Sequence, residues 1–170
     1  MTDINAESQE KPVILLVDDN TINLQLLFET LDGQGYQLLA ARSGEEALRI
    51  ARKATPDLIL LDIMMPGIDG YETCARLKAD EVTRNSVVIF LTALQSTEEK
   101  VKGLSMGAMD FITKPFDPEE IIARVSIQLE NHRKHQELLR HNQQLTEKLA
   151  TSLESNSGGQ DAHADRKSVV

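Results

Sequence analysis

The chain has little of several residue types on which other protein classes depend. It contains one cysteine, Cys74, so no disulfide can form within it, and we expect this thiol to be a small buried helix residue. Aromatic residues make up 4% of the 170 residues, so a core must be built from aliphatic side chains and methionine. No apolar run approaches the roughly 18 residues of a membrane-spanning helix, and the polar, acidic N-terminus is unlike a secretory signal. These absences predict a soluble, cytoplasmic domain.

Basic residues are also too few to favour an anionic partner. Lysine and arginine number 18 against 27 aspartates and glutamates, which gives a formal net charge of −9. Binding to a phosphate backbone or to an anionic membrane surface needs a basic face. We therefore expect neither nucleic acid nor a membrane as a partner.

Three short apolar runs indicate strands that are buried on both faces. They are Val13–Val17, Leu58–Leu61 and Val87–Leu91, and a polar residue follows each run at once. Runs of this length, apolar on both faces, are typical of strands inside a parallel sheet. Tyr36–Ala41 and Met109–Thr113 are weaker strand candidates.

Segments with helical periodicity alternate with these runs. They are Thr21–Asp32, Gly44–Ala54, Asp69–Ala79, Thr97–Met106 and a helix that begins at Pro118. In the first of them we expect Ile22, Leu24, Leu27 and Leu31 to face inward. Five repeats of strand and helix predict an α/β fold, a doubly wound five-stranded parallel sheet with right-handed crossovers.

The last helix is predicted to extend beyond the folded domain. Neither glycine nor proline occurs between Pro118 and about Leu153, so a continuous helix would be about 50 Å long. We divide the chain into a disordered N-terminal tail, a folded domain, an extended C-terminal helix and a disordered polar tail. The corresponding residues are 1–11, 12–130, 131–154 and 155–170.

This helical extension carries a short heptad pattern. Leu138 and Leu145 occupy d positions, and Asn142 and Leu149 occupy a positions. A lone asparagine at an a position is typical of parallel two-stranded coiled coils. Polar residues separate this set from the upstream apolar positions Ile122, Val125 and Leu129, which we expect to pack on the sheet or on a partner. The pattern predicts a weak homodimer, with a single solvated helix as the alternative.

Polar residues cluster where the predicted strands end. Ligands of open α/β sheets bind at the carboxyl ends of the strands. The residues at these ends are Asp18, Asp19, Asp62, Thr92 and Lys114. Carboxylates about 5 Å apart repel by roughly 3 kcal/mol per pair at an effective dielectric near 20, which favours recruitment of a cation. A hard oxygen site of this kind suits Mg²⁺, and a hydroxyl and an ammonium beside it suit phosphoryl transfer onto Asp62.

Four stretches of the chain resemble the receiver domain of two-component response regulators, over about residues 12–130. They are LLVDDN, DLILLDIMMPGIDGYE, FLTA and GAMDFITKPF, in that order. The resemblance implies a flavodoxin-like strand order of 2-1-3-4-5. It also implies that a histidine kinase, a phosphotransfer protein or a small phosphodonor phosphorylates Asp62, and that the domain then switches conformation to control partner binding or dimerisation.

The resemblance also implies a role for each site residue. Asp19 is the expected direct Mg²⁺ ligand, Asp18 acts largely through water, and Asp62 and the backbone carbonyl of Met64 complete the metal site. Two further residues, Thr92 and Lys114, are expected to contact the phosphoryl group. Phe111 is the switch aromatic that turns inward when Thr92 moves toward phosphate. The Lys114–Pro115 bond resembles a cis peptide of the family.

Other readings of the sequence remain open. A haloacid-dehalogenase-like phosphatase also uses an aspartate and Mg²⁺, but it needs a second acid two residues after the nucleophile, where this chain has Met64 or Asn20. A phosphorylation-independent interaction module is disfavoured by the complete set of site residues. We expect no enzyme with an external substrate, and either a stand-alone regulator or a chain cut before an output domain. Structural roles are expected for three aspartates and four histidines, namely Asp57, Asp69, Asp110, His132, His135, His141 and His163.

Overall fold

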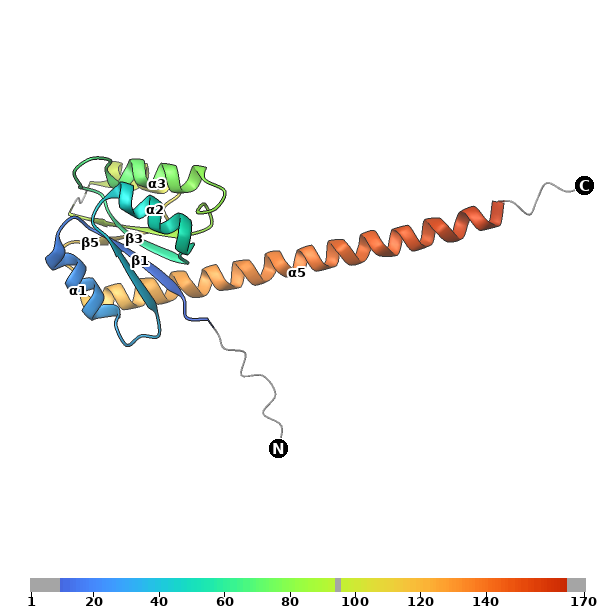
Figure 1. Cartoon of the computed structure of the whole chain (residues 1–170), viewed down its shortest axis with the longest axis horizontal. Coiled ribbons are helices and arrows are strands. Elements are labelled where there is room, and N and C mark those ends of the chain that lie inside the picture. Colours follow the sequence, from blue (N-terminus) through green and yellow to red (C-terminus); the bar gives the residue numbers. More distant parts are fainter. Residues whose placement is uncertain (1–9, 94–95, 165–170) are drawn as a thin grey trace, which may run out of the picture. The chain divides into compact units, whose positions relative to one another are not determined.

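Five strands and five helices alternate along the part of the chain that the structure describes (Figure 1). The structure is a computed structural model that describes residues 10–93 and 96–164, with the backbone alone for 158–164. The elements are β1 Val13–Val17, α1 Thr21–Leu31, β2 Gln37–Ala41, α2 Gly44–Ala54, β3 Leu58–Asp62, α3 Gly70–Ala79, β4 Val87–Thr92, α4 Thr97–Ser105, β5 Asp110–Thr113 and α5 Pro118–Ala164.

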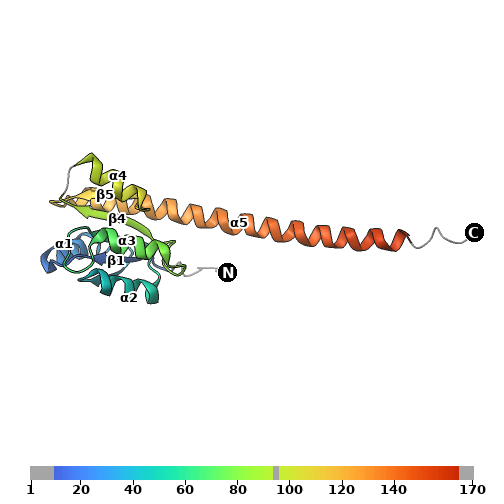
Figure 2. The same cartoon turned by 90° about the horizontal axis from the view of Figure 1, so that it is seen from above.

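The strands form one parallel sheet in the order β2-β1-β3-β4-β5. This order and the doubly wound architecture confirm the predicted fold. Helices cover both faces, with α2 and α3 on one side and α1 and the start of α5 on the other (Figure 1). Alternate residues of each central strand supply the two cores, as Leu60 and Ile59 do for β3. Helix α4 lies beside β5 at one edge of the sheet (Figure 2).

Two predictions about which helix residues face the core need correction. Leu24, Leu27 and Leu31 are buried as expected, but Ile22 is 74% exposed. Ile22 is two residues from Leu24, and two residues on a helix point about 200° apart. In α5 the residue in the core is Ile121, while Ile122 is only half-buried, and packing against the sheet rather than periodicity decides between these two apolar neighbours.

Helix α5 continues beyond its predicted end near Leu153 and reaches Ala164. The prediction of a disordered tail from residue 155 is therefore wrong as far as Ala164. The tail contains no proline, which would break a helix. The Ser155 and Ser157 hydroxyls donate to the carbonyls of Ser152 and Glu154, and such hydrogen bonds are compatible with a helix. The rest of this tail, and residues 1–9 of the predicted N-terminal tail, lie outside the described residues.

The first turns of α5 are fixed to β5 by an ion pair. Nη1 of Arg124 lies 3.0 Å and 2.8 Å from the two carboxylate oxygens of Asp110, and its Nε donates to Glu120 at 2.9 Å. Hydrogen bonds to both carboxylates raise the pKa of Arg124 further above its usual value. The strand that carries Phe111 and the helix that follows it are thereby tied together.

No helix among residues 10–93 and 96–164 has both the length and the apolar character needed to cross a bilayer. Cys74 is buried in α3, as predicted, and burial raises the pKa of its thiol.

Candidate functional site

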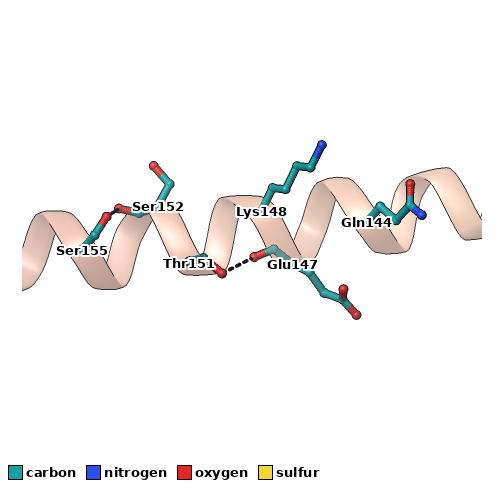
Figure 3. Close-up of a pocket in the computed structure, with 6 residues that line it drawn as sticks. All are labelled: Gln144, Glu147, Lys148, Thr151, Ser152 and Ser155. Carbon is teal, nitrogen blue, oxygen red and sulfur yellow. Dashed lines mark hydrogen bonds between the residues drawn. The ribbon is translucent and has the colours of Figure 1, made fainter.

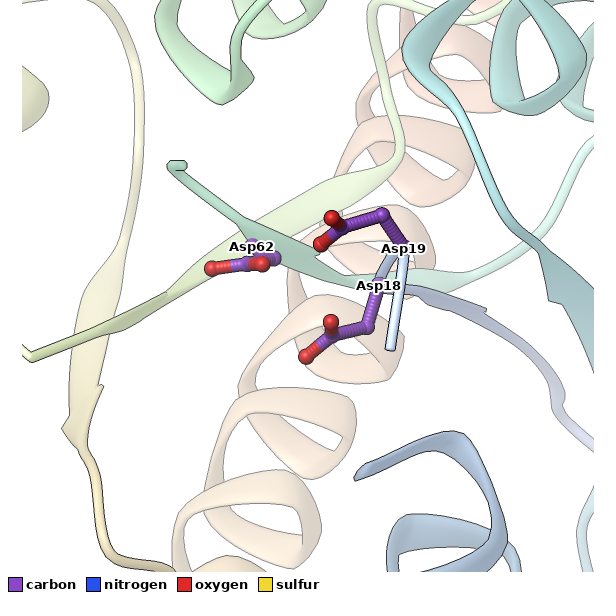
Figure 4. Close-up of side chains that lie close together, drawn as sticks. All are labelled: Asp18, Asp19 and Asp62. Carbon is purple, nitrogen blue, oxygen red and sulfur yellow. The ribbon is translucent and has the colours of Figure 1, made fainter. Parts of the chain in front are cut away.

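Three carboxylates meet at the carboxyl edge of the sheet. Asp18 and Asp19 directly follow β1, and Asp62 is the last residue of β3. The two strands are paired, with Val17 opposite Leu61, so both end at the same level of the sheet. One carboxylate oxygen from each of the three aspartates lies within 4.8 Å of the others (Figure 4). The predicted acidic cluster is thus present.

The start of α1 holds the Asp18 carboxylate in place. The backbone N–H of Asn20 donates to Oδ1 of Asp18 at 2.9 Å, and the Asn23 side-chain amide donates to Oδ2 at 3.1 Å. The side chain of Asn20 also caps α1 by accepting from the N–H of Ile22. Asn23 was not predicted as a support of the site. Its position in the first turn after a cap residue was the available signal.

Lys114 directly follows the edge strand β5, and its side chain reaches the acidic cluster. Its backbone N–H donates to the carbonyl of Thr92 at 2.8 Å, which aligns the end of β5 with the end of β4. Its Nζ lies 3.1 Å from Oδ1 of Asp62 and 3.4 Å from Oδ2 of Asp18. The Lys114–Pro115 peptide is cis, as the resemblance implied.

The environment of Asp62 makes its carboxyl easier to protonate than an ordinary aspartate when no cation is bound. Burial raises the pKa of this carboxyl from 3.8 to about 6, and the charge of Asp18 adds to the rise, while the hydrogen bond and the charge of Lys114 oppose it. One ammonium therefore does not offset the burial of the cluster. A cation with a higher charge would relieve this imbalance.

The loop after β3 packs closely against the backbone of Asp62. The N–H of Gly70 donates to the carbonyl of Ile63 at 2.9 Å, and a Cβ at Gly70 would collide with the backbone carbonyl oxygen of Asp62. Glycine is therefore required for the start of α3 to approach the end of β3. Met64 lies in this loop with its side chain exposed, and the role of its carbonyl as a metal ligand stays a prediction.

Thr92 lies on β4, the strand next to that of Asp62, and Phe111 lies on β5, the strand beyond it. Thr92 is buried at the end of β4, and it pairs in register with Thr113, the residue before Lys114. The Phe111 ring is half-buried, with its centroid 5.7 Å from that of Phe90, which in turn lies 5.4 Å from Tyr71. The structure thus brings Thr92 to the acidic edge and places Phe111 within an aromatic cluster.

The aspartates that were assigned to structural roles have those roles. Asp57 accepts from the N–H of Val13 at 2.8 Å, Asp69 caps α3 by accepting from the N–H of Glu72 at 2.8 Å, and Asp110 pairs with Arg124. None of the three belongs to the acidic cluster.

A hollow on α5 offers no comparable chemistry. Its lining comes from a single helix, and Figure 3 shows the six side chains spread along that helix. They are Gln144, Glu147, Lys148, Thr151, Ser152 and Ser155. The ring of His132 in the same helix lies 3.0 Å from the amide of Gln136. Among the described residues, no histidine joins a group of three or more potential metal ligands.

The donor set of the acidic cluster fits Mg²⁺. It consists of carboxylate oxygens alone, which are the hard ligands that this ion prefers, and a protein site for Mg²⁺ commonly has few carboxylates and leaves room for water and phosphate. The pKa of Asp62 is raised, first by burial and then by the charge of Asp18, and a bound cation would oppose both effects.

Comparisons with known proteins agree with this geometry. Residues 14–126 match the model of the response regulator receiver domain. The chain is 45% identical over 112 residues to the response regulator PleD of Caulobacter vibrioides, a match that covers 66% of this chain and 25% of PleD. A solved putative response regulator from Chloroflexus aurantiacus has a TM-score of 0.68 and 37% identity, and the match covers 71% of this chain and 99% of that one. The chemotaxis protein CheY4 of Vibrio cholerae has a TM-score of 0.65 and 32% identity, with 68% and 97% covered. The chain spans from a quarter to about half the length of the curated relatives it matches.

Proposed function

The chain belongs to the family of response regulator receiver domains of two-component systems, and on this premise we propose that Asp62 is its phosphoacceptor. The donor would be the phosphohistidine of a histidine kinase or of a phosphotransfer protein, or a small phosphodonor. The observation that supports this role most directly is the position of Asp62, which is buried, contacts Lys114 and clusters with Asp18 and Asp19. The acyl phosphate would then switch the conformation of the domain and its affinity for partners.

The reaction follows from the groups around Asp62. An oxygen of the Asp62 carboxylate attacks phosphorus, a new O–P bond forms, and the P–N bond of a phosphohistidine donor breaks with its electron pair returning to the imidazole. Lys114, now 3.1 Å from Asp62, is placed to donate to an oxygen of the transferred group. Asp18, Asp19 and Asp62 would hold Mg²⁺, which when bound supplies positive charge against the phosphoryl oxygens.

The switch would run from Thr92 to Phe111. The Thr92 hydroxyl would move toward a phosphoryl oxygen, and Phe111 on the adjacent strand would turn into the space that Thr92 leaves. Register pairing of β4 with β5 supports this coupling, because it places the two residues on neighbouring strands. The proposal gives the chain no external substrate, and any turnover would be self-catalysed gain and loss of its own phosphoryl group.

Mass spectrometry of the intact protein tests the phosphoacceptor. With Mg²⁺ and acetyl phosphate, the mass should rise by about 80 Da, and the adduct should be lost in alkali as an acyl phosphate is. Asp62→Asn should abolish the adduct, whereas Asp57→Asn, at the half-buried residue directly before the same strand, should keep it. An adduct that persists in Asp62→Asn would overturn the assignment.

A further inference from the structure

Helix α5 carries an exposed apolar stripe in its distal part. From Asn131 onward the chain forms a compact unit of its own, separate from the receiver domain. Five leucines of this part are exposed to solvent, namely Leu138, Leu139, Leu145, Leu149 and Leu153. In proteins, most of the stability of a helix comes from packing its apolar face against a partner.

We propose that this stripe is the seam of a parallel, in-register coiled coil between two copies of the chain. Leu138 and Leu145 occupy d positions and Asn142 and Leu149 occupy a positions, so each copy contributes four consecutive core layers. All three leucines are exposed in one copy, with exposed fractions of 62%, 47% and 65% in chain order. The proposal concerns assembly alone and does not depend on phosphorylation.

Asn142 identifies the occupant as a second copy and sets its orientation. In a parallel, in-register pair, Asn142 lies opposite Asn142 of the second copy, and the two amides can bond to each other. In the antiparallel pair that overlaps all four layers, Asn142 lies opposite Leu145, and its amide is buried without a partner. A different protein would have to supply its own polar group at that layer, whereas an identical chain supplies it automatically.

The residues beside the seam agree with parallel pairing. Lys134 and Lys148 occupy g positions, and in a parallel pair they lie against Leu139 and Leu153 of the second copy at e positions. The aliphatic stems of these lysines can cover the leucines while their ammonium groups stay in water. The outer face is polar and carries the ion pair of Arg133 with Glu137 at 2.9 Å.

The seam is short, so the association should be weak. Polar residues occupy the core positions on either side of it, with Asn131 and His135 before Leu138 and Ser152 and Asn156 after Leu149. Three leucine layers bury little apolar area relative to what stable association needs. We expect a monomer–dimer equilibrium in the micromolar range.

Sedimentation equilibrium of the full chain tests the seam. The wild type should dimerise with increasing concentration, and Leu145→Asp should lower the association constant by at least about tenfold because it places a charge in a core layer. Gln144→Asp introduces the same side chain one residue earlier, outside the seam, and should dimerise like the wild type. A wild type that stays monomeric at high micromolar concentration, or a dimer that survives Leu145→Asp, would overturn the proposal.

Cross-linking in a glutathione redox buffer tests the orientation. Ser152→Cys places a thiol at a d position, next to its counterpart in a parallel dimer, but about 25 Å from it in the antiparallel pair. The variant should form a disulfide-linked dimer, while Thr151→Cys, which points away from the seam, should not. The wild type is the second control, because Cys74 is buried. A Ser152→Cys dimer that does not cross-link would refute the parallel arrangement.

Discussion

Lys114 holds its Nζ 3.1 Å from the carboxylate of Asp62, although 52 residues separate the two in the chain. Removing this ammonium tests its role in the switch. Lys114→Ala should still bind Mg²⁺ and accept a phosphoryl group, because the three carboxylates remain. It should lose the conformational change, because no ammonium draws the end of β5 toward the phosphoryl oxygen.

Hydrogen exchange of β4 and β5 with and without beryllium fluoride measures this change. Lys114→Arg is the control that keeps the charge, and an unchanged response in Lys114→Ala would contradict the expected role.

Protonation of Asp62 should compete with the cation. The metal-free folded protein has an Asp62 pKa raised to about 6, mainly by burial, so this carboxyl is mostly ionised at pH 7.5 and mostly protonated at pH 5. A raised pKa means that the folded state binds this proton more tightly than the unfolded state. Its ionisation therefore lowers the stability of the metal-free protein as pH rises through about 6, and Mg²⁺ restores what is lost.

The increase of Tm on adding Mg²⁺ measures this competition. It should be larger at pH 7.5 than at pH 5 in the wild type. Asp62→Asn should remove most of this pH dependence, because the neutral amide does not titrate near pH 6. Equal increases at the two pH values in the wild type would show that Asp62 does not control the site.

Gly103 limits the space available to Phe111. A Cβ at this position in α4 would lie 2.6 Å from Cζ of Phe111 and 3.0 Å from Cδ2 of Phe90. Gly103→Ala should therefore lower the free energy of unfolding by about 1–3 kcal/mol, despite the better helix propensity of alanine. Urea denaturation measures the loss. Ser105→Ala, at an exposed position of the same helix, should stay within about 0.5 kcal/mol of the wild type.

A double-mutant cycle identifies the contact that causes this loss. Adding Phe111→Ala removes the ring that the new methyl group would meet, so Gly103→Ala should cost less in that background. Additive losses would place the strain elsewhere in the helix.

Much of the fold could be predicted because the strands are buried on both faces and thus appear as unbroken apolar runs. Asp18, Asp62 and Lys114 converge as expected, since each lies at the carboxyl end of a strand in a sheet whose strands are all parallel. Asn23 could not be predicted in the same way, because its contact with Asp18 depends on how α1 is oriented relative to β1.

The errors at helix faces and ends have a different cause. Periodicity alone did not distinguish Ile121 from Ile122, since both are apolar and only packing against the sheet decides between them. The end of α5 was placed too early because glycines and serines predict a tail. In the structure no proline or cap stops the helix before Ala164.

The phosphorylated state should be long-lived. Met64 and Leu94 occupy the positions two residues after Asp62 and after Thr92, where a side chain would flank an attacking water. Met64 is exposed, and Leu94 lies outside the described residues. Neither side chain can orient water by hydrogen bonding, so combining Met64→Asn with Leu94→Glu should shorten the lifetime of the acyl phosphate severalfold.

Phosphate release measured after removal of excess acetyl phosphate reports this lifetime. The matched control places the same new side chains at two other exposed apolar positions, Met109→Asn and Leu104→Glu, and should decay like the wild type. A Met64→Asn, Leu94→Glu variant that decays no faster than this control would refute the explanation.

Phosphorylation should tighten the α5 dimer. The residues of the proposed switch, Thr92 and Phe111, lie on the strands that precede α5, so a rearrangement of them should reach the first turns of this helix. Sedimentation with beryllium fluoride should give a larger association constant for the full chain, and no dimer for a chain that ends at Glu130. If beryllium fluoride leaves the association constant unchanged, phosphorylation does not control dimerisation and the prediction is wrong.

The ion pair between Arg124 and Asp110 links β5 to the start of α5. Asp110 is the neighbour of Phe111 in β5, and Arg124 belongs to the helix that follows, so a shift of β5 should be passed to the start of α5. In any such linked system, the free energy that phosphorylation contributes to partner binding equals the free energy that the bound partner returns to phosphorylation. A protein that binds α5 more tightly after phosphorylation must therefore raise the fraction of phosphorylated chains at equilibrium. Downstream targets would in this way set the sensitivity of the domain to its own phosphodonor.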